Sequence, residues 1–159
     1  MSLTTLCDCG GGCGDSDFAY PMRADVYYST VEQGDYGSIK KQWMKAKTIS
    51  CHFTSGGIKN KQEQQPQNVA ITFDTILNGR TPSDIRFSDL GSGTSLTNIL
   101  ITNIVDGEGN SLYLETGGIR AGKSTLFEIA TLNPSSGLFG KTEYYKLIIK
   151  RSDNQAVDL

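Results

Sequence analysis

A glycine-rich segment at residues 117–124 has the spacing of a phosphate-binding loop. Its letters are GGIRAGKS, so a glycine and four residues precede Gly122, Lys123 and Ser124. In nucleotide hydrolases this loop joins a strand to a helix, and the helix amides and the lysine hold the phosphates. On its own, the pattern points to ATP or GTP binding.

The sequence after this loop does not supply the rest of a nucleotide hydrolase. The segment TLFEIATL (125–132) alternates β-forming residues and stops before a proline, which favours a strand; a helix with Leu126 and Ile129 on one face is the alternative. Only 36 residues follow Lys123 (159 − 123), too few for the units that hold magnesium and the catalytic water. We therefore interpret the segment as a cationic β-hairpin tip and expect no enzyme activity.

The cysteines are the candidate metal ligands. Cys7, Cys9 and Cys13 lie close together among glycines, which let a backbone wrap around a metal, and Cys51 would complete a set of four thiolates. Zinc or an iron–sulfur cluster would fit such a set. Free thiols, with Cys51 as a small core residue, and a disulfide within the leader are the alternatives. Apart from this site, we expect no cofactor.

Other residues that could take part in catalysis or bind a metal have simpler explanations. His52 follows Cys51 on an alternating strand, so the two side chains should point to opposite faces and cannot form a nucleophile–base pair. Residues 106–110, DGEGN, imitate the start of a calcium loop, but its twelfth position would be Gly117 instead of glutamate. We expect a solvent-facing histidine and a hairpin turn.

Composition narrows the class of protein. The chain has 159 residues with 15 basic and 17 acidic side chains, and this balance argues against a dedicated binder of nucleic acid or anionic membranes. No apolar run approaches the roughly 20 residues of a membrane span. The N-terminus has neither the basic head nor the apolar core of a signal peptide, so we expect no export.

A local excess of lysine is the one departure from this balance. Most such runs are solvated faces, although in a ring-shaped assembly they would line a channel for DNA. The lysines are Lys40, Lys41, Lys45, Lys47, Lys59 and Lys61.

Eighteen glycines and four prolines, with many β-forming residues, favour short strands joined by glycine turns. We expect an all-β fold, a small β-barrel or sandwich of about eight short strands. We expect residues 1–17 to form a Cys/Gly-rich N-terminal arm and residues 18–159 to form a single barrel domain, with a long polar loop at 55–68. A second flexible loop is expected at 91–95. The expected strands lie at 24–31, 38–43, 49–53, 69–73, 99–105, 111–116, 125–132 and 143–151, with a short one around Ile85 and Phe87.

Two stretches of the chain resemble the head-closure proteins of tailed bacteriophages, also called stoppers or head–tail connectors. One is ADVYYSTVEQGDYGSIKKQWMKAKTISCHF (24–53); the other, within residues 97–151, contains ILITNI, LFEIATL and YYKLIIKR. The resemblance implies a small β-barrel that forms a ring beneath the portal and adaptor. It also implies that a long loop, here 55–68, faces the central channel.

The resemblance therefore implies a structural virion protein of a phage neck, which joins the head to the tail and helps to retain packaged DNA. Its expected partners are further copies of itself, the portal or adaptor and tail-terminator proteins, with passing contact to DNA and none to membranes. It would assemble in the cytoplasm of the bacterial host and reside in the virion. The alternatives are another tail or baseplate protein, such as a tail terminator, and a small metal-binding or nucleotide-binding enzyme.

Overall fold

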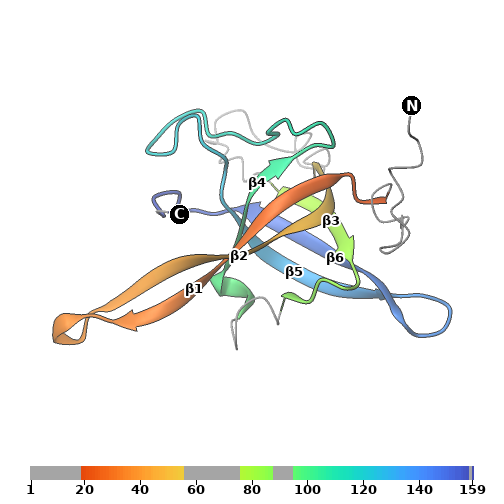
Figure 1. Cartoon of the computed structure of the whole chain (residues 1–159), viewed down its shortest axis with the longest axis horizontal. Helices are drawn as coiled ribbons and strands as arrows, with labels where there is room; N and C mark the ends of the chain where they lie inside the picture. Colours follow the sequence, from red (N-terminus) through yellow and green to blue (C-terminus); the bar gives the residue numbers. More distant parts are fainter. Residues whose placement is uncertain (1–18, 56–75, 88–94, 158) are drawn as a thin grey trace, which may run out of the picture.

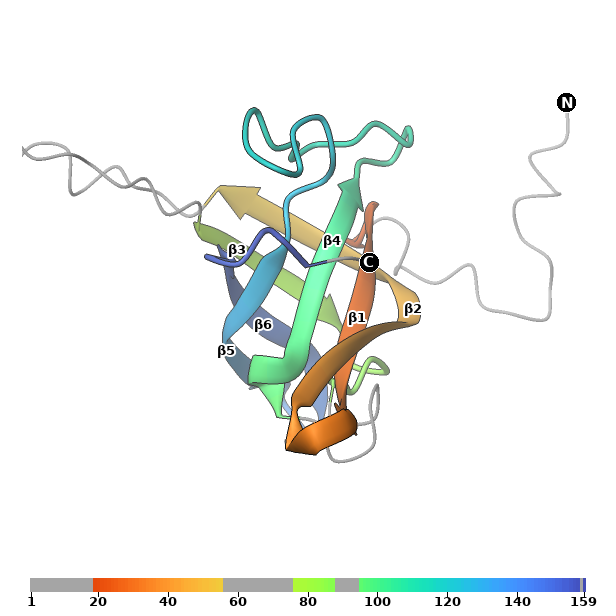
Figure 2. The ribbon, with the colours of Figure 1, turned by 90° about the vertical axis from the view of Figure 1, so that its left-hand side faces the viewer.

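The chain folds as an antiparallel β-barrel (Figures 1 and 2). The computed structural model describes residues 19–55, 76–87, 95–157 and 159. Within them six strands close on themselves in the order β1-β2-β3-β6-β5-β4. These are β1 (Met22–Gln33), β2 (Ile39–Ser55), β3 (Ile76–Pro82), β4 (Ile99–Val105), β5 (Phe127–Ser136) and β6 (Thr142–Arg151). The expected all-β fold class is confirmed.

Alternate residues of every strand fill the interior of the barrel. On β2, Ile49, Cys51 and Phe53 are buried, and the residues between them are less buried, as the sequence pattern predicted. Gly79 on β3 lies opposite Phe53, and a Cβ atom at that position would collide with the aromatic ring. The core also contains Met22, Ala24, Val26, Leu77, Ile99, Ile101, Ile104, Phe127, Ile129, Leu147 and Ile149.

The strand β4 is buried on both faces, also as expected. Ile99 and Ile101 point into the core, while Leu100 and Thr102 on the outer face are exposed by only 2% and 1%. A long connection (residues 106–126), called here the upper loop, follows β4 (Figure 1). Its Tyr113 packs edge-on against Phe127, with ring centroids 5.6 Å apart, and so ties the loop to the core.

The strand count differs from the expected eight in the part of the chain that is described. The segments expected at 38–43 and 49–53 are one strand, β2, because the residues between them continue to pair with β1. Residues 111–116 form only isolated bridges to Val105 and Ser124, since the upper loop turns back before a ladder can develop.

Neither the short strand expected around Ile85 and Phe87 nor the strand expected at 69–73 is among the six strands of the described residues. Ile85 and Phe87 are buried, at 4% and 1% exposure, but they belong to irregular structure that packs against the barrel. The expected strand at 69–73, almost all of the loop at 55–68, the loop at 91–95 except for its last residue, and the arm at 1–17 lie outside the described residues.

Candidate functional site

The hairpin of β1 and β2 extends beyond the barrel as a two-stranded ribbon (Figure 1). The last pair between β1 and β4 is Tyr28 with Ile99, and β2 pairs with β3 only from His52 onward. In residues 29–43, called here the ribbon, β1 and β2 therefore pair only with each other, and no third strand of the described part of the chain lies beside them. A ribbon of this kind is marginal by itself in water, so its conformation depends on how its base is fixed.

A polar cluster around Asp25 fixes the base of the ribbon. The Asp25 carboxylate accepts hydrogen bonds from Thr48 Oγ1 at 2.6 Å and Asn103 Nδ2 at 2.9 Å, and Lys45 Nζ lies 3.1 Å away. Partial burial would raise the pKa of Asp25, but these hydrogen bonds and the lysine charge together lower it. Asn103 adopts a positive φ of 52°, where the register between β1 and β4 shifts. The cluster thus joins β1, β2 and β4 within the barrel, three residues before Tyr28, the last β1 residue that pairs with β4.

The two faces of the ribbon differ in character. Cross-strand partners point to the same face, so Val31 and Ile39, which are 61% and 73% exposed, share one face with Trp43. On the opposite face, Gln42 Nε2 donates a hydrogen bond of 2.6 Å to Glu32 Oε2. The face with Val31 also carries Gln33 and Lys41, and Trp43 at its base is partly buried, so the exposed apolar part of the face is Val31 with Ile39.

The tip of the ribbon displays an aromatic side chain in a strained backbone conformation. Tyr36 has a φ of 63°, in the left-handed region that bulky residues avoid, and its side chain is fully exposed. Gly37 follows with a φ of 76°, and Gly34 N donates to Ser38 O at 2.6 Å to close the turn. Strained backbone of this kind clusters at binding and switch positions, and among the described residues the exposed Tyr36 side chain has no burial that would offset it.

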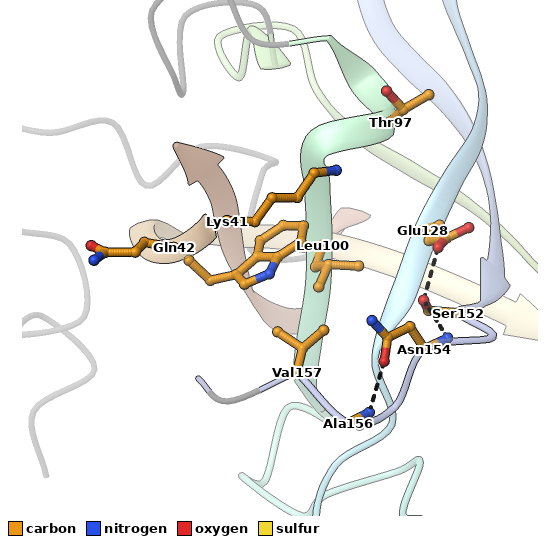
Figure 3. A pocket seen from close by; sticks show the side chains of 10 residues that line it. Lys41, Gln42, Thr97, Leu100, Glu128, Ser152, Asn154, Ala156 and Val157 are labelled. Atoms are coloured by element: carbon orange, nitrogen blue, oxygen red, sulfur yellow. Dashed lines mark hydrogen bonds between the residues drawn. The ribbon is translucent and has the colours of Figure 1, made fainter. Parts of the chain in front are cut away.

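A pocket of about 620 Å³, called here the basal pocket, lies where the ribbon meets the barrel (Figure 3). Leu100, Trp43 and Val157 supply apolar surface. Lys41 and Glu128 supply one charge of each sign; Lys41 Nζ donates to Asn98 Oδ1 at 3.3 Å, and Glu128 accepts a 2.8 Å bond from a serine hydroxyl. The remaining lining residues are Gln42, Thr97, Ser152, Asn154 and Ala156.

The C-terminal tail forms one wall of the basal pocket. It runs across the outer surface of β5 and β4 (Figure 2). Gln155 clamps it there, because its side chain accepts from Leu126 N at 3.1 Å and donates to Leu126 O at 2.9 Å. Asn154 Oδ1 accepts from Ala156 N at 3.2 Å (Figure 3), which shapes the next turn of the tail. The pocket is thus built from four separate parts of the chain: β2, the start of β4, β5 and the C-terminal tail.

A second projection lies at the other end of the long axis (Figure 1). It is the turn between β5 and β6 (residues 137–141), called here the β5–β6 tip. Leu138 and Phe139 are 99% and 92% exposed there. Gly137 N donates to Lys141 O at 2.8 Å, and Gly140 adopts a φ of 70°, so the turn itself is ordered by hydrogen bonds.

The phosphate-loop match is followed by a strand, as the sequence analysis favoured, but it lies among turns of the upper loop and not at the tip of a hairpin of two strands. Residues 117–124 form successive turns in the upper loop, and the strand β5 follows in place of a helix. Gly122 N donates to Glu115 O at 2.8 Å and Lys123 N to Arg120 O at 2.8 Å. These amides are therefore occupied by carbonyls of the loop itself and do not form a phosphate cradle.

The candidate cysteine site is only partly within the described residues. Cys51 is fully buried in the barrel, and burial raises the pKa of its thiol to about 12. The thiolate is the metal-binding form, so this environment favours the alternative of a small core residue. Cys7, Cys9 and Cys13 lie outside the described residues, and the four-cysteine site stays a prediction. Among the residues described, no group of three or more potential ligands is placed to hold a metal.

The other candidate residues lie apart from one another. His52 is partly exposed on the face opposite Cys51 and lines a separate hollow of about 640 Å³ with Arg80. Asp106 accepts bonds from Glu108 N at 2.9 Å and Asn110 N at 2.8 Å, which is the turn that the sequence predicted. The pKa of Asp106 is lowered, mainly because its carboxylate accepts the hydrogen bond from the Asn110 backbone amide.

Two of the four lysines of β2 contribute to the basal pocket and to the Asp25 cluster. Lys41 lines the basal pocket and Lys45 contacts Asp25, while Lys40 and Lys47 are exposed. Lys59 and Lys61 lie outside the described residues. None of the described helices has the length and apolarity to cross a membrane.

Sequence analysis missed the residues that distinguish these surfaces. The sequence did contain hints of them. Trp43 is an aromatic residue at the end of a basic strand, and Leu138 and Phe139 are an apolar pair between two glycines. Their significance depends on which strands outrun their neighbours, and this is decided by pairing between distant segments.

Comparison with known proteins adds little to this geometry. No protein-family model matches the chain, and no curated protein matches it significantly. A similar solved structure is the solution structure of protein SF1141 from Shigella flexneri 2a. It is 14% identical, with 86% of this chain and 96% of that chain covered and a TM-score of 0.41. A likeness at this level carries no argument about function.

Proposed function

We propose that this chain is a structural protein of a tailed-phage neck, where copies of it assemble into a ring between the portal or adaptor and the tail. The resemblance of residues 24–53 to head-closure proteins suggests the setting. The observation that carries the proposal is the ribbon, which presents Val31, Ile39 and Tyr36 to solvent from a base fixed by Asp25.

The physical argument is that exposed apolar side chains on a projecting element gain free energy only when a partner covers them. Burial of apolar surface contributes roughly 25 cal/mol per Å², and large aromatic side chains dominate many protein interfaces. The left-handed Tyr36 at the tip supports this, since its aromatic side chain is fully exposed among the described residues and is free for a partner to cover. In this role the protein binds neighbouring proteins through arms and edges and catalyses no reaction.

The test is a complementation assay with a double variant of the apolar ribbon face, Val31→Ser with Ile39→Ser. The yield of DNA-filled, tailed particles should fall about tenfold or more, because loss of central interface contacts costs on the order of 2 kcal/mol. The control is Lys40→Ser on the opposite face of the same ribbon, which should give a yield within about twofold of wild type. Equal yields from both variants, with the barrel folded by circular dichroism, would refute a role for this face in assembly.

A further inference from the structure

The β5–β6 tip is built as a projecting apolar knob. Leu138 and Phe139 are adjacent, almost fully exposed, and held by the hydrogen-bonded turn between Gly137 and Lys141. A rigid turn loses little conformational entropy when its side chains bind, so the knob is preorganised for a pocket. Among the described residues, Leu138 and Phe139 are the only two large apolar neighbours in sequence that are both more than 90% exposed.

The basal pocket offers an apolar wall inside a lining that is otherwise largely polar. Its apolar surface comes from Trp43, Leu100 and Val157, and a cavity of about 620 Å³ is within the range of pockets that bind ligands or side chains. The knob is flanked by exposed Lys141 and Glu143. The pocket contains Glu128 and Lys41, so each partner offers one charge of each sign.

The two surfaces lie toward opposite ends of the molecule. The β5–β6 tip and the ribbon project at the two ends of the long axis, and the basal pocket lies at the root of the ribbon (Figure 1). A knob at one end and a pocket toward the other cannot satisfy each other within one copy. Between copies they produce a head-to-tail contact, which closes into a ring when the rotation per subunit permits.

We infer that the β5–β6 tip of one copy binds the basal pocket of the next, with Leu138 and Phe139 as the anchoring side chains. The inference rests on the proposed function only for its setting in a ring. It identifies the partner as a second copy of this chain and gives the two surfaces of the contact. In the contact, Lys141 and Glu143 face the pocket charges Glu128 and Lys41.

Sedimentation velocity of the full chain, from about 10 µM to about 1 mM, measures the contact directly. Wild-type protein should form concentration-dependent oligomers. The knob variant, Leu138→Ser with Phe139→Ser, and the pocket variant Ala156→Arg should each weaken association about 30-fold or more. Ala156 is exposed and only its backbone is hydrogen-bonded, so the arginine fills the pocket without removing a contact. The matched control is Ile119→Ser, at an 83% exposed apolar residue outside both surfaces, which should behave as wild type.

A mixture of the two variants provides the sharper test. The knob variant keeps its pocket and the pocket variant keeps its knob, so together they can form one contact but no chain of contacts. The expected product is a heterodimer and nothing larger, formed with the affinity of the wild-type contact. A heterodimer that is absent, or a wild-type chain that stays monomeric throughout the range, overturns the inference.

These outcomes separate the inference from the proposed function. If the knob variant abolishes particle assembly in the complementation assay while wild-type chains do not self-associate, the tip binds a different neck protein. That result overturns the head-to-tail contact and leaves the structural role intact. If self-association follows the expected pattern but particles form normally with both variants, the contact exists and the proposed neck function fails.

Discussion

The bidentate pair of Glu115 and Arg151 joins the upper loop to the last strand of the barrel. Arg151 Nε and Nη2 each lie 2.9 Å from a different Glu115 oxygen, and the Glu115 side chain is only 10% exposed. The hydrogen bond from Arg151 is the largest cause of a lowered Glu115 pKa. A carboxylate with a lowered pKa stabilises the fold above its unfolded-state pKa, and this contribution is lost as the pH falls through the folded-state value.

We predict that Glu115→Gln lowers the free energy of unfolding by roughly 1.5–3 kcal/mol at neutral pH, because it removes charge-assisted hydrogen bonds. The difference from wild type should shrink as the pH falls below the ordinary glutamate value of 4.5, because Glu115 of the unfolded chain then takes up a proton while the folded carboxylate, with its lowered pKa, still resists it. Urea unfolding at a series of pH values measures it. Asp153→Asn, at an exposed carboxylate, is the control. A difference that stays constant down to pH 2 would show that the charge of Glu115 is not involved.

At the scale of elements, the ribbon stores strain that the barrel does not require. Tyr36 holds a left-handed conformation without burying its side chain. Asparagine tolerates this conformation better than tyrosine does.

We therefore predict that Tyr36→Asn leaves the free energy of unfolding unchanged or raises it by up to about 1 kcal/mol, whereas it weakens assembly. Thermal melting gives the first quantity and particle yield gives the second. Ser38→Ala is the control for the turn, because it removes only a 3.1 Å hydrogen bond to Asp35 O. A clear loss of stability in Tyr36→Asn would mean that the tyrosine serves the fold instead.

Strand identity was largely predictable from alternation, since residues such as Ile49, Cys51 and Phe53 repeat every second position. What alternation cannot give is the length of neighbouring strands. β2 continues through residues 44–48, and β1 outruns β4 after Tyr28, because of pairing between segments far apart in the chain. The ribbon was therefore visible as two strands and a turn but not as a projection.

The candidate site was less predictable, for the same reason. Trp43 and Val157 meet in one pocket because Gln155 holds the tail to Leu126 and Arg120 donates to the Val157 carbonyl at 3.3 Å. In contrast, the residues after Ser124 favoured a strand over the helix that a phosphate loop requires, and the structure has the strand β5 there. A local pattern can be rejected on local grounds, whereas a composite surface needs the fold.

At the scale of the whole molecule, a closed barrel leaves few unpaired strand edges, and its two hairpin projections offer the natural contacts for assembly. One projection carries Tyr36 and the other carries Leu138 and Phe139, at opposite ends of the long axis. Such an arrangement suits a subunit with one neighbour on each side. The proposed neck role requires that these neighbours include copies of the chain.

The most direct test of that role is a cryo-electron microscopy reconstruction of the virion whose genome encodes this chain. We predict a ring of six-stranded barrels at the junction of head and tail, with the ribbon and the β5–β6 tip of each copy in contact with adjoining subunits. A junction fully accounted for by other chains, with no density for this barrel there, would contradict the account.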